Sequence, residues 1–163
     1  MSAPFRIGHG FDAHRLVAGR PFVLGGVTIP HETGPLGHSD ADVAAHALCD
    51  AILGAAALGD LGTHFPDSDP QWAGADSMRL LAACATMARE AGYDLGNVDA
   101  TVVVQRPRLA PHLPAVRARV AETLGLELDA VSVTAKTSEG MGYTGDGSGI
   151  AAYAVALLAR RGT

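Results

Sequence analysis

Strand-like and helix-like segments alternate along almost the whole of this sequence, and that alternation limits the fold more than any other feature. Segments with the apolar spacing of β-strands are expected at residues 5–12, 22–24, 27–29, 98–105 and 131–137. Helices are expected at residues 39–58, 76–90 and 112–124. No repeat or linker divides the chain, so we expect a single domain over residues 1–163 with an α/β (α+β two-layer) fold, one mixed β-sheet packed against helices.

Capping residues mark the ends of the first two helices. Ser39 or Asp40 can cap the first helix, with Asp42 placed for a capping box and Gly59 as the stop signal. Gly92 is expected to end the second helix in the same way.

Other stretches are less regular. Residues 62–74 form a Pro/Asp-rich loop, of a length that is usual for functional or mobile loops. Pro107 and Pro111 frame the turn into the third helix, and residues 140–149 are glycine-rich. Residues 150–158 are so rich in alanine that their periodicity does not distinguish a helix from a strand.

Composition and charge exclude several classes of function. The 12 basic and 17 acidic residues give a net charge of −5 without a run of Lys or Arg, so nucleic acid is not an expected partner. Apolar residues make up 48% and aromatic residues only 5%, a mixture that favours close backbone packing. The N-terminus lacks a signal-peptide pattern, and the longest apolar stretch, residues 150–159, is half the length of a membrane span. We therefore expect a cytoplasmic protein that does not enter a membrane.

Two motifs that can carry chemistry are expected to be inert here. Cys49 and Cys84 lie in Ala/Leu-rich helical stretches without a CxxC pair, so we interpret them as small buried hydrophobic residues. Residues 140–145 match the GxGxxG pattern of dinucleotide-binding folds, but no acidic residue follows in a second strand of a βαβ unit. These glycines are better interpreted as places where a ligand or a neighbouring subunit approaches the backbone.

Two histidine-bearing segments near the start of the chain predict a metal site. Asp12 and His14 are two residues apart, so both side chains point to the same face of an extended strand. His46 falls inside a helical pattern that can pack across that face. One carboxylate and two imidazoles suit a catalytic zinc ion, whose fourth position stays open for substrate.

Each of these residues also has an ordinary interpretation. A lone His46 on an Ala/Leu helix is more often a hydrogen-bonded core histidine, and its joint presence with His38 and Ser39 is what favours a metal. Asp50, one helical turn after His46, either orients an imidazole or is a plain carboxylate on the helix surface. Solvated side chains are expected for His31, His64 and His112.

Five blocks of sequence are long and specific enough to identify a family. They are GHGFDAH, LGHSDADVAAHALCDAILGAAALGDLGTHFPDSDP, GADS, LGNVDATVVVQRPRLAPH and AKTSEGMGYTG. In this order and spacing they closely resemble the 2-C-methyl-D-erythritol 2,4-cyclodiphosphate synthases. The resemblance implies that 4-diphosphocytidyl-2-C-methyl-D-erythritol 2-phosphate is converted to the cyclic diphosphate with release of CMP, in non-mevalonate isoprenoid biosynthesis.

The resemblance also implies a homotrimer around a three-fold axis, with active sites between neighbouring subunits. The implied Zn²⁺ ligands are Asp12, His14 and His46. A second divalent cation, Mg²⁺ or Mn²⁺, is expected between the substrate's phosphates and Glu139. His38 and Thr137 are the expected catalytic residues, acting as hydrogen-bonding stabilisers of the transition state.

Substrate contacts are implied on two groups of segments. The methylerythritol phosphate and the loop over it involve Asp12, His14, His38, Ser39, Asp60, Gly62, Phe65, Asp67 and Asp69. The cytidine and its diphosphate involve Val104, Gln105, Arg108, Leu109, Ala110, Lys136, Thr137, Ser138 and Glu139. Tyr143 is a further expected contact.

Two other functions remain open at this point. A zinc phosphohydrolase would use the open metal position to activate water and would release linear products. A catalytically silent trimeric binding module would form no product and would tolerate loss of Asp12, His38 or Glu139.

Overall fold

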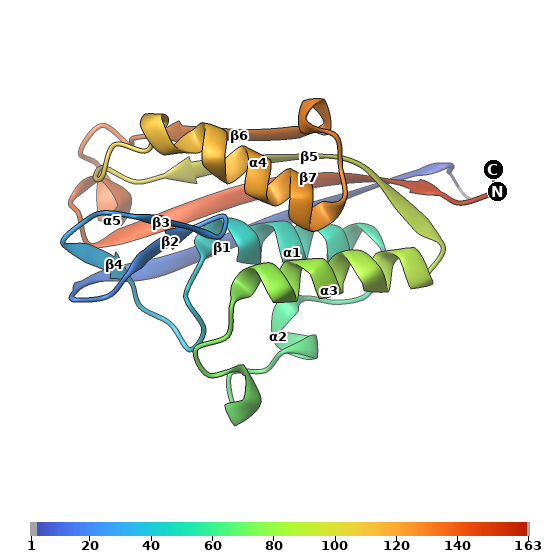
Figure 1. Cartoon of the computed structure of the whole chain (residues 1–163), viewed down its shortest axis with the longest axis horizontal. Helices are drawn as coiled ribbons and strands as arrows, with labels where there is room; N and C mark the ends of the chain where they lie inside the picture. The colour runs from blue at the N-terminus through green and yellow to red at the C-terminus, as the bar shows by residue number, and fades with distance from the viewer. Residues whose placement is uncertain (1–2, 163) are drawn as a thin grey trace.

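A five-stranded mixed sheet forms the centre of the structure, in the order β4–β1–β7–β5–β6 (Figure 1). The structure is a computed structural model that describes residues 3–162. Strands β5 and β6 run parallel, and the other neighbouring strands run antiparallel. The strands of this sheet are β1 (Phe5–Ala18), β4 (Thr33–Pro35), β5 (Tyr93–Val103), β6 (Val131–Lys136) and β7 (Gly149–Arg160). A separate hairpin pairs β2 (Phe22–Leu24) with β3 (Val27–Ile29), as expected.

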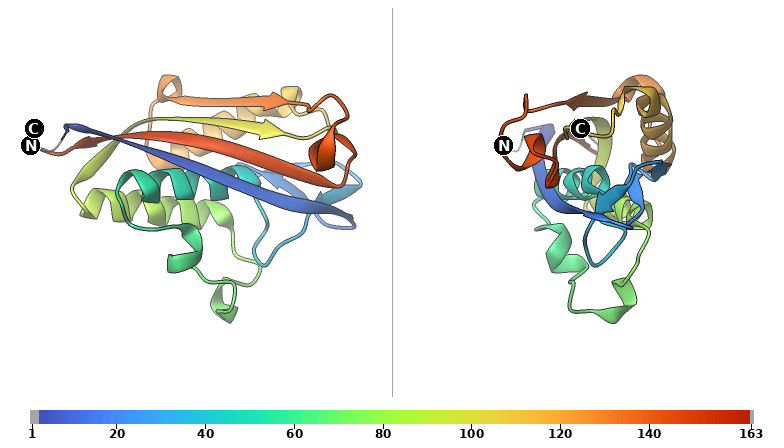
Figure 2. Two further views of the ribbon diagram at one scale, coloured as in Figure 1. Left: turned by 180° about the vertical axis from the view of Figure 1, so that it is seen from behind. Right: turned by 90° about the vertical axis from the view of Figure 1, so that its left-hand side faces the viewer.

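The long helices all cover one face of this sheet, and Figure 2 shows the opposite face with only a short helical turn, residues 142–145, over one end of it. Helix α1 (Val43–Ala55) packs on β1 and β7, α3 (Ser77–Glu90) lies beside α1, and α4 (Leu113–Leu124) packs on β6. The shorter helical turns are α2 (Leu61–His64), α5 (Gly142–Gly145) and the 3₁₀ turns Pro70–Trp72, Ala110–His112 and Leu128–Ala130. The predicted class, one mixed sheet packed against helices, is confirmed.

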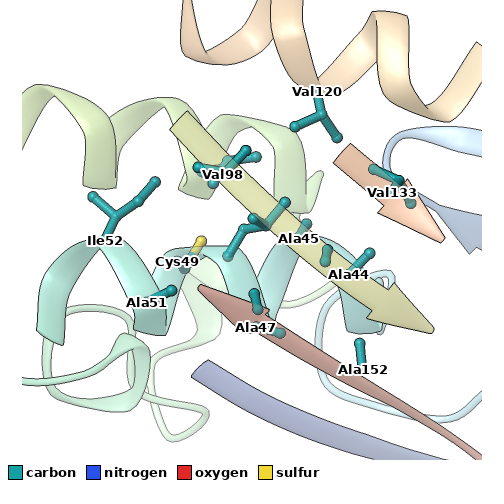
Figure 3. Packing of buried hydrophobic residues seen from close by; sticks show 14 of the residues in the cluster. Ala44, Ala45, Ala47, Cys49, Ala51, Ile52, Val98, Val120, Val133 and Ala152 are labelled. Carbon is teal, nitrogen blue, oxygen red and sulfur yellow. The ribbon is translucent and has the colours of Figure 1, made fainter. Parts of the chain in front are cut away.

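The contact between α1 and the sheet is made by small residues. A β-carbon on Gly10 would overlap the carbonyl oxygen of Ala47, and one on Gly8 would overlap that of Ala51. Figure 3 shows the small side chains of Ala44, Ala47 and Ala51 spaced along α1 beside β7, the strand that carries Ala152. Close backbone packing, expected from the composition, therefore brings the helix that carries His46 directly onto β1.

The bounds of the first strand and helix differ from the prediction. Strand β1 extends beyond residue 12 because it continues to pair with β7 and then with β4. Ala41 has a φ of 57°, which excludes residues 39–41 from the helix, so neither Ser39 nor Asp40 is the cap. Asp42 is the N-cap itself and accepts a hydrogen bond from the Ala45 N–H (3.1 Å). The helix ends at residue 55 rather than 58, before Ala57, which has a φ of 58°.

Later segments also depart from expectation. The strand predicted at 98–105 is β5, which begins five residues earlier at Tyr93. The loop at 62–74 contains most of α2 and a 3₁₀ turn. The alanine-rich residues 150–158 belong to β7, a central strand paired on both sides. Alanine suits this strand because α1 lies so close to it.

Cys49 and Cys84 are buried free thiols, as expected. Residues 140–145 lead into β7, which is antiparallel to β5, so this motif opens no parallel βαβ unit. No helix between residues 3 and 162 is long and apolar enough to cross a membrane.

Candidate metal centre and substrate cavities

Asp12, His14 and His46 converge as predicted. Asp12 and His14 lie on the helix-facing side of β1, and His46 comes from α1. One ligand atom from each residue lies within 4.8 Å of the other two. Oδ2 of Asp12 is 2.8 Å from Nε2 of His14 and 3.0 Å from Nδ1 of His46, and the two ring nitrogens are 3.3 Å apart. These three atoms face one small space that a cation can enter.

The remaining nitrogen of each imidazole has a hydrogen-bond partner. Nδ1 of His14 donates to the carbonyl oxygen of Leu36 (3.0 Å). Nε2 of His46 lies 2.8 Å from Oγ of the buried Ser77. Metal-ligating histidines usually engage their second nitrogen in this way, because it fixes the tautomer and the ring orientation. The donor set and its partners therefore fit a divalent cation such as zinc.

The electrostatics of the cluster keep Asp12 ionised. Burial acts to raise the pKa of Asp12, but the hydrogen bonds and charges of His14 and His46 outweigh it and lower the pKa to about 2. Burial likewise acts to lower the pKa of His46, and the hydrogen bond and charge of Asp12 reverse this and raise it. A carboxylate that stays ionised is the form that binds a metal.

A cavity of about 550 Å³ opens beside the cluster. Predicted residues that line it are Asp12, His14, His38, Ser39, His46, Gly62, Phe65 and Asp67. Asp50 also lines it, but neither interpretation offered for Asp50 describes it fully. Its Oδ1 accepts a hydrogen bond from the N–H of Leu61 (2.7 Å), so it holds the start of α2 beside the cavity.

A second cavity, of about 730 Å³, lies at the ends of β5 and β6. Its predicted residues are Val104, Gln105, Arg108, Leu109, Ala110, Lys136 and Thr137. The two cavities have no lining residue in common. His31 lines the second cavity and is half-buried against the ring of Phe22, so the expectation of a solvated side chain is wrong there.

Five predicted site residues lie outside both linings: Asp60, Asp69, Ser138, Glu139 and Tyr143. Asp60 caps α2 by accepting from the Thr63 N–H (2.9 Å). Asp69 caps a 3₁₀ turn, and its carbonyl oxygen is 3.3 Å from Nε2 of His38. Glu139 is exposed and does not join the three-residue cluster. Tyr143 lines a smaller hollow of about 220 Å³ that also includes His14.

Two residues of the metal centre were not predicted. Ser77 contacts His46, and Asp40 accepts hydrogen bonds from both the hydroxyl and the N–H of Ser77. Both lie in blocks that carried the resemblance, but the sequence offered no sign that residues 37 positions apart would meet. Their contact depends on the packing of α3 beside α1.

Comparison with known proteins gives consistent matches over nearly the full chain. The model of the YgbB family matches residues 5–159. A 2-C-methyl-D-erythritol 2,4-cyclodiphosphate synthase from Geobacter metallireducens is 60% identical over 156 residues, covering 96% of this chain and 99% of the relative. The protein of that name from Burkholderia thailandensis is 58% identical, with 96% of each chain covered.

Solved structures agree with the fold. A 2C-methyl-D-erythritol-2,4-cyclodiphosphate synthase in a CDP-bound form is 42% identical, with a TM-score of 0.87 over 94% of this chain and 99% of that one. The bifunctional IspDF from Campylobacter jejuni is 40% identical, with a TM-score of 0.93 over 98% of this chain. The present chain spans 43% of the length of that bifunctional protein.

Proposed function

The chain belongs to the YgbB family, and we propose that it converts 4-diphosphocytidyl-2-C-methyl-D-erythritol 2-phosphate to 2-C-methyl-D-erythritol 2,4-cyclodiphosphate and CMP. It is an enzyme, a phosphorus–oxygen lyase of non-mevalonate isoprenoid biosynthesis. The observation that carries the proposal is the convergence of Asp12, His14 and His46 beside a cavity, in a chain 60% identical to a synthase of that name.

The reaction joins two parts of one molecule. An oxygen of the 2-phosphate attacks the β-phosphorus of the diphosphate, the bond to the bridging oxygen breaks, and CMP leaves with the electron pair. The chain must hold the substrate folded, because good orientation lowers the activation barrier of an intramolecular reaction by roughly 7–11 kcal/mol. The cavity of about 550 Å³ beside Asp12, His14 and His46, called the metal side below, is the proposed place for the methylerythritol phosphate. The cavity of about 730 Å³ lined by Arg108 and Lys136, called the nucleotide side below, is the proposed place for the cytidine.

The metal centre is proposed to hold Zn²⁺ through Asp12, His14 and His46. Two imidazoles and one carboxylate with an open fourth position are a common catalytic zinc site. A cation bound there supplies positive charge that reduces the repulsion between the two phosphate groups. Glu139, an exposed carboxylate, is the proposed protein ligand of a second cation, Mg²⁺ or Mn²⁺, which the substrate's phosphates would share.

His38 and Thr137 are the proposed catalytic residues. Each can donate a hydrogen bond to a phosphate oxygen as charge shifts in the transition state. His38 lines the metal-side cavity and Thr137 the other cavity. Little acid–base chemistry is required, because the phosphates are already ionised. Arg108 and Lys136, which line the second cavity, supply side-chain cations for the diphosphate.

Two observations support a homotrimer with active sites between subunits. The two cavities share no lining residue, so a neighbouring chain can bring its second cavity against the metal side of this one. The uncovered face of the sheet exposes large apolar side chains, which favours burial against further copies. They are Ile7 (73% exposed), Phe11 (45%), Tyr153 (45%) and Val155 (42%).

Mixing two impaired variants tests the shared site, with activity assayed at a substrate concentration far below KM, where a variant with weakened binding turns over slowly. His46→Ala removes the metal side, and the double variant Arg108→Ala/Lys136→Ala weakens the nucleotide side. If each site combines halves from two neighbouring chains, an equal mixture that is unfolded and refolded together recovers activity in about a quarter of its sites. No recovery from a mixture that has reassembled, followed by native mass spectrometry, would contradict the shared site.

Phosphorus NMR tests the reaction itself. The protein with substrate, Zn²⁺ and Mg²⁺ is expected to produce the cyclic diphosphate and CMP. Linear phosphate products would instead indicate a zinc phosphohydrolase, and no product at all would indicate a catalytically silent binding module.

A further inference from the structure

Ser77 is a buried hydroxyl at the metal centre that the proposed reaction does not use. It is the first residue of α3 and has no exposed surface. Its Oγ lies 2.8 Å from Nε2 of His46, closer than the 3.2 Å between that nitrogen and Oγ of Ser39. Ser77 is therefore the nearer of the two hydroxyl contacts of this imidazole nitrogen.

Asp40 determines which way the Ser77 hydroxyl points. Its carboxylate accepts the hydroxyl hydrogen, and its Oδ2 also accepts from the main-chain N–H of Ser77 (3.1 Å). A hydroxyl has one hydrogen to donate, so an oxygen that donates to Asp40 accepts from His46. Nε2 of His46 then carries a hydrogen, and Nδ1 is the nitrogen left available to a cation.

We propose that Ser77 and Asp40 are positioning residues for the metal, which fix the ring orientation and the hydrogen position of His46. Nδ1 of His46 is thereby aimed at the space it shares with Asp12 and His14. The inference rests on the proposed metal centre and extends it to α3. Hydrogen-bond partners of metal-ligating histidines typically contribute 10–100-fold to metal affinity.

The same contact ties the metal centre to the segment between α2 and α3. Residues 65–67 of that segment line the metal-side cavity. Further along it, the Gly74 N–H donates to the carbonyl of His38 (2.8 Å), and the Asp40 N–H donates to the carbonyl of Ala75 (3.2 Å). Ser77 follows directly in the sequence. Asp40 and Ser77 therefore hold in place both the end of the cavity-lining segment and the proposed metal ligand His46.

Zinc affinity of the full chain tests the proposal, measured with Zn²⁺ alone in competition with a chromophoric chelator. Ser77→Ala is expected to weaken Zn²⁺ binding 10–100-fold and to alter the visible absorption of the Co²⁺-substituted protein. Ser77→Thr keeps the hydroxyl and is expected to restore most of the affinity. Asp76→Ala is the matched control. The Asp76 carboxylate caps the same helix by accepting a hydrogen bond from the Met78 N–H (2.9 Å), and its removal breaks no bond to His46.

Each outcome decides the proposal. Equal Zn²⁺ affinity of Ser77→Ala and the unaltered chain overturns it, and so does an equal loss in Asp76→Ala, since the effect would then come from the helix. If Ser77→Ala fails to fold by circular dichroism, Asp40→Asn takes its place, with the same loss expected and an unchanged affinity overturning the proposal. If the unaltered chain binds no Zn²⁺, the proposed metal centre fails as well, which distinguishes that failure from one confined to Ser77 and Asp40.

Discussion

The two cavities differ in how far this chain alone holds their polar groups in place. On the metal side, both imidazoles use one ring nitrogen to bond a neighbouring oxygen and the other to reach Asp12. On the nucleotide side, neither the Arg108 guanidinium nor the Lys136 ammonium has a hydrogen-bond or ion-pair partner among residues 3–162. A metal requires ligands set in advance, whereas long cationic side chains can be ordered by the phosphates they bind. Metal-side variants should therefore affect chemistry, and nucleotide-side variants should affect binding.

The largest effect is expected from His46→Ala. Loss of this ligand should abolish stoichiometric Zn²⁺ binding and lower kcat on the order of a thousandfold, because charge stabilisation worth several kcal/mol is removed. Circular dichroism should show a folded protein. His112→Ala, which lies outside both cavity linings, is the control and should keep its zinc. An unchanged zinc content by elemental analysis in His46→Ala would show that the ligand assignment is wrong.

Gly10→Ala tests whether the metal side depends on the close contact of α1 and β1. The added methyl would overlap the Ala47 carbonyl, so α1 must move away from the strand that carries Asp12 and His14. We expect a loss of unfolding free energy of about 1–3 kcal/mol, as for overpacking, together with weaker zinc binding. Gly54→Ala is the control on the same helix, because an added β-carbon there meets only the His9 carbonyl oxygen, at 3.9 Å, and so adds a methyl without the overlap. Normal zinc affinity in Gly10→Ala would show that zinc binding does not depend on the close contact of α1 and β1.

Arg108→Ala and Lys136→Ala test the other half of the comparison. Each should raise KM about tenfold, the loss of one charge-assisted phosphate contact of about 1.5 kcal/mol, with little change in kcat. Zinc content should stay at the level of the unaltered chain. Arg79→Ala, an exposed cation of α3 outside both cavity linings, is the matched control for a lost positive charge. A fall in kcat with an unchanged KM would mean that these cations act in the transition state, and the contrast between the cavities would fail.

The same contrast explains which parts of the metal side could be predicted from the sequence. Asp12 and His14 follow from the two-residue period of a strand, and His46 from its helical pattern, because each depends on local geometry. The roles of Asp40 and Ser77 could not be predicted, because their contact depends on how two helices pack. Strand β7 could not be distinguished from a helix for a related reason. Its alanines reflect the nearness of α1, and alanine carries no strand preference of its own.

The smallest effect is expected from Asp94→Asn, which supplies a baseline for both halves. Asp94 and Arg161 form an exposed ion pair (2.7 Å) where β5 begins and β7 ends, outside both cavity linings. The hydrogen bond from Arg161 lowers the pKa of Asp94, so the pair stabilises the folded chain above the ordinary pKa of 3.8 and the contribution is lost as the pH falls through the lowered value. Unfolding by urea at pH 7 should show a slight loss of stability that vanishes in high salt, because exposed pairs are screened. Zinc content and KM should not change. A shift in either would mean that distant changes in the sheet reach the cavities. Effects at Arg108 and Lys136 could then no longer be assigned to direct contact with phosphate.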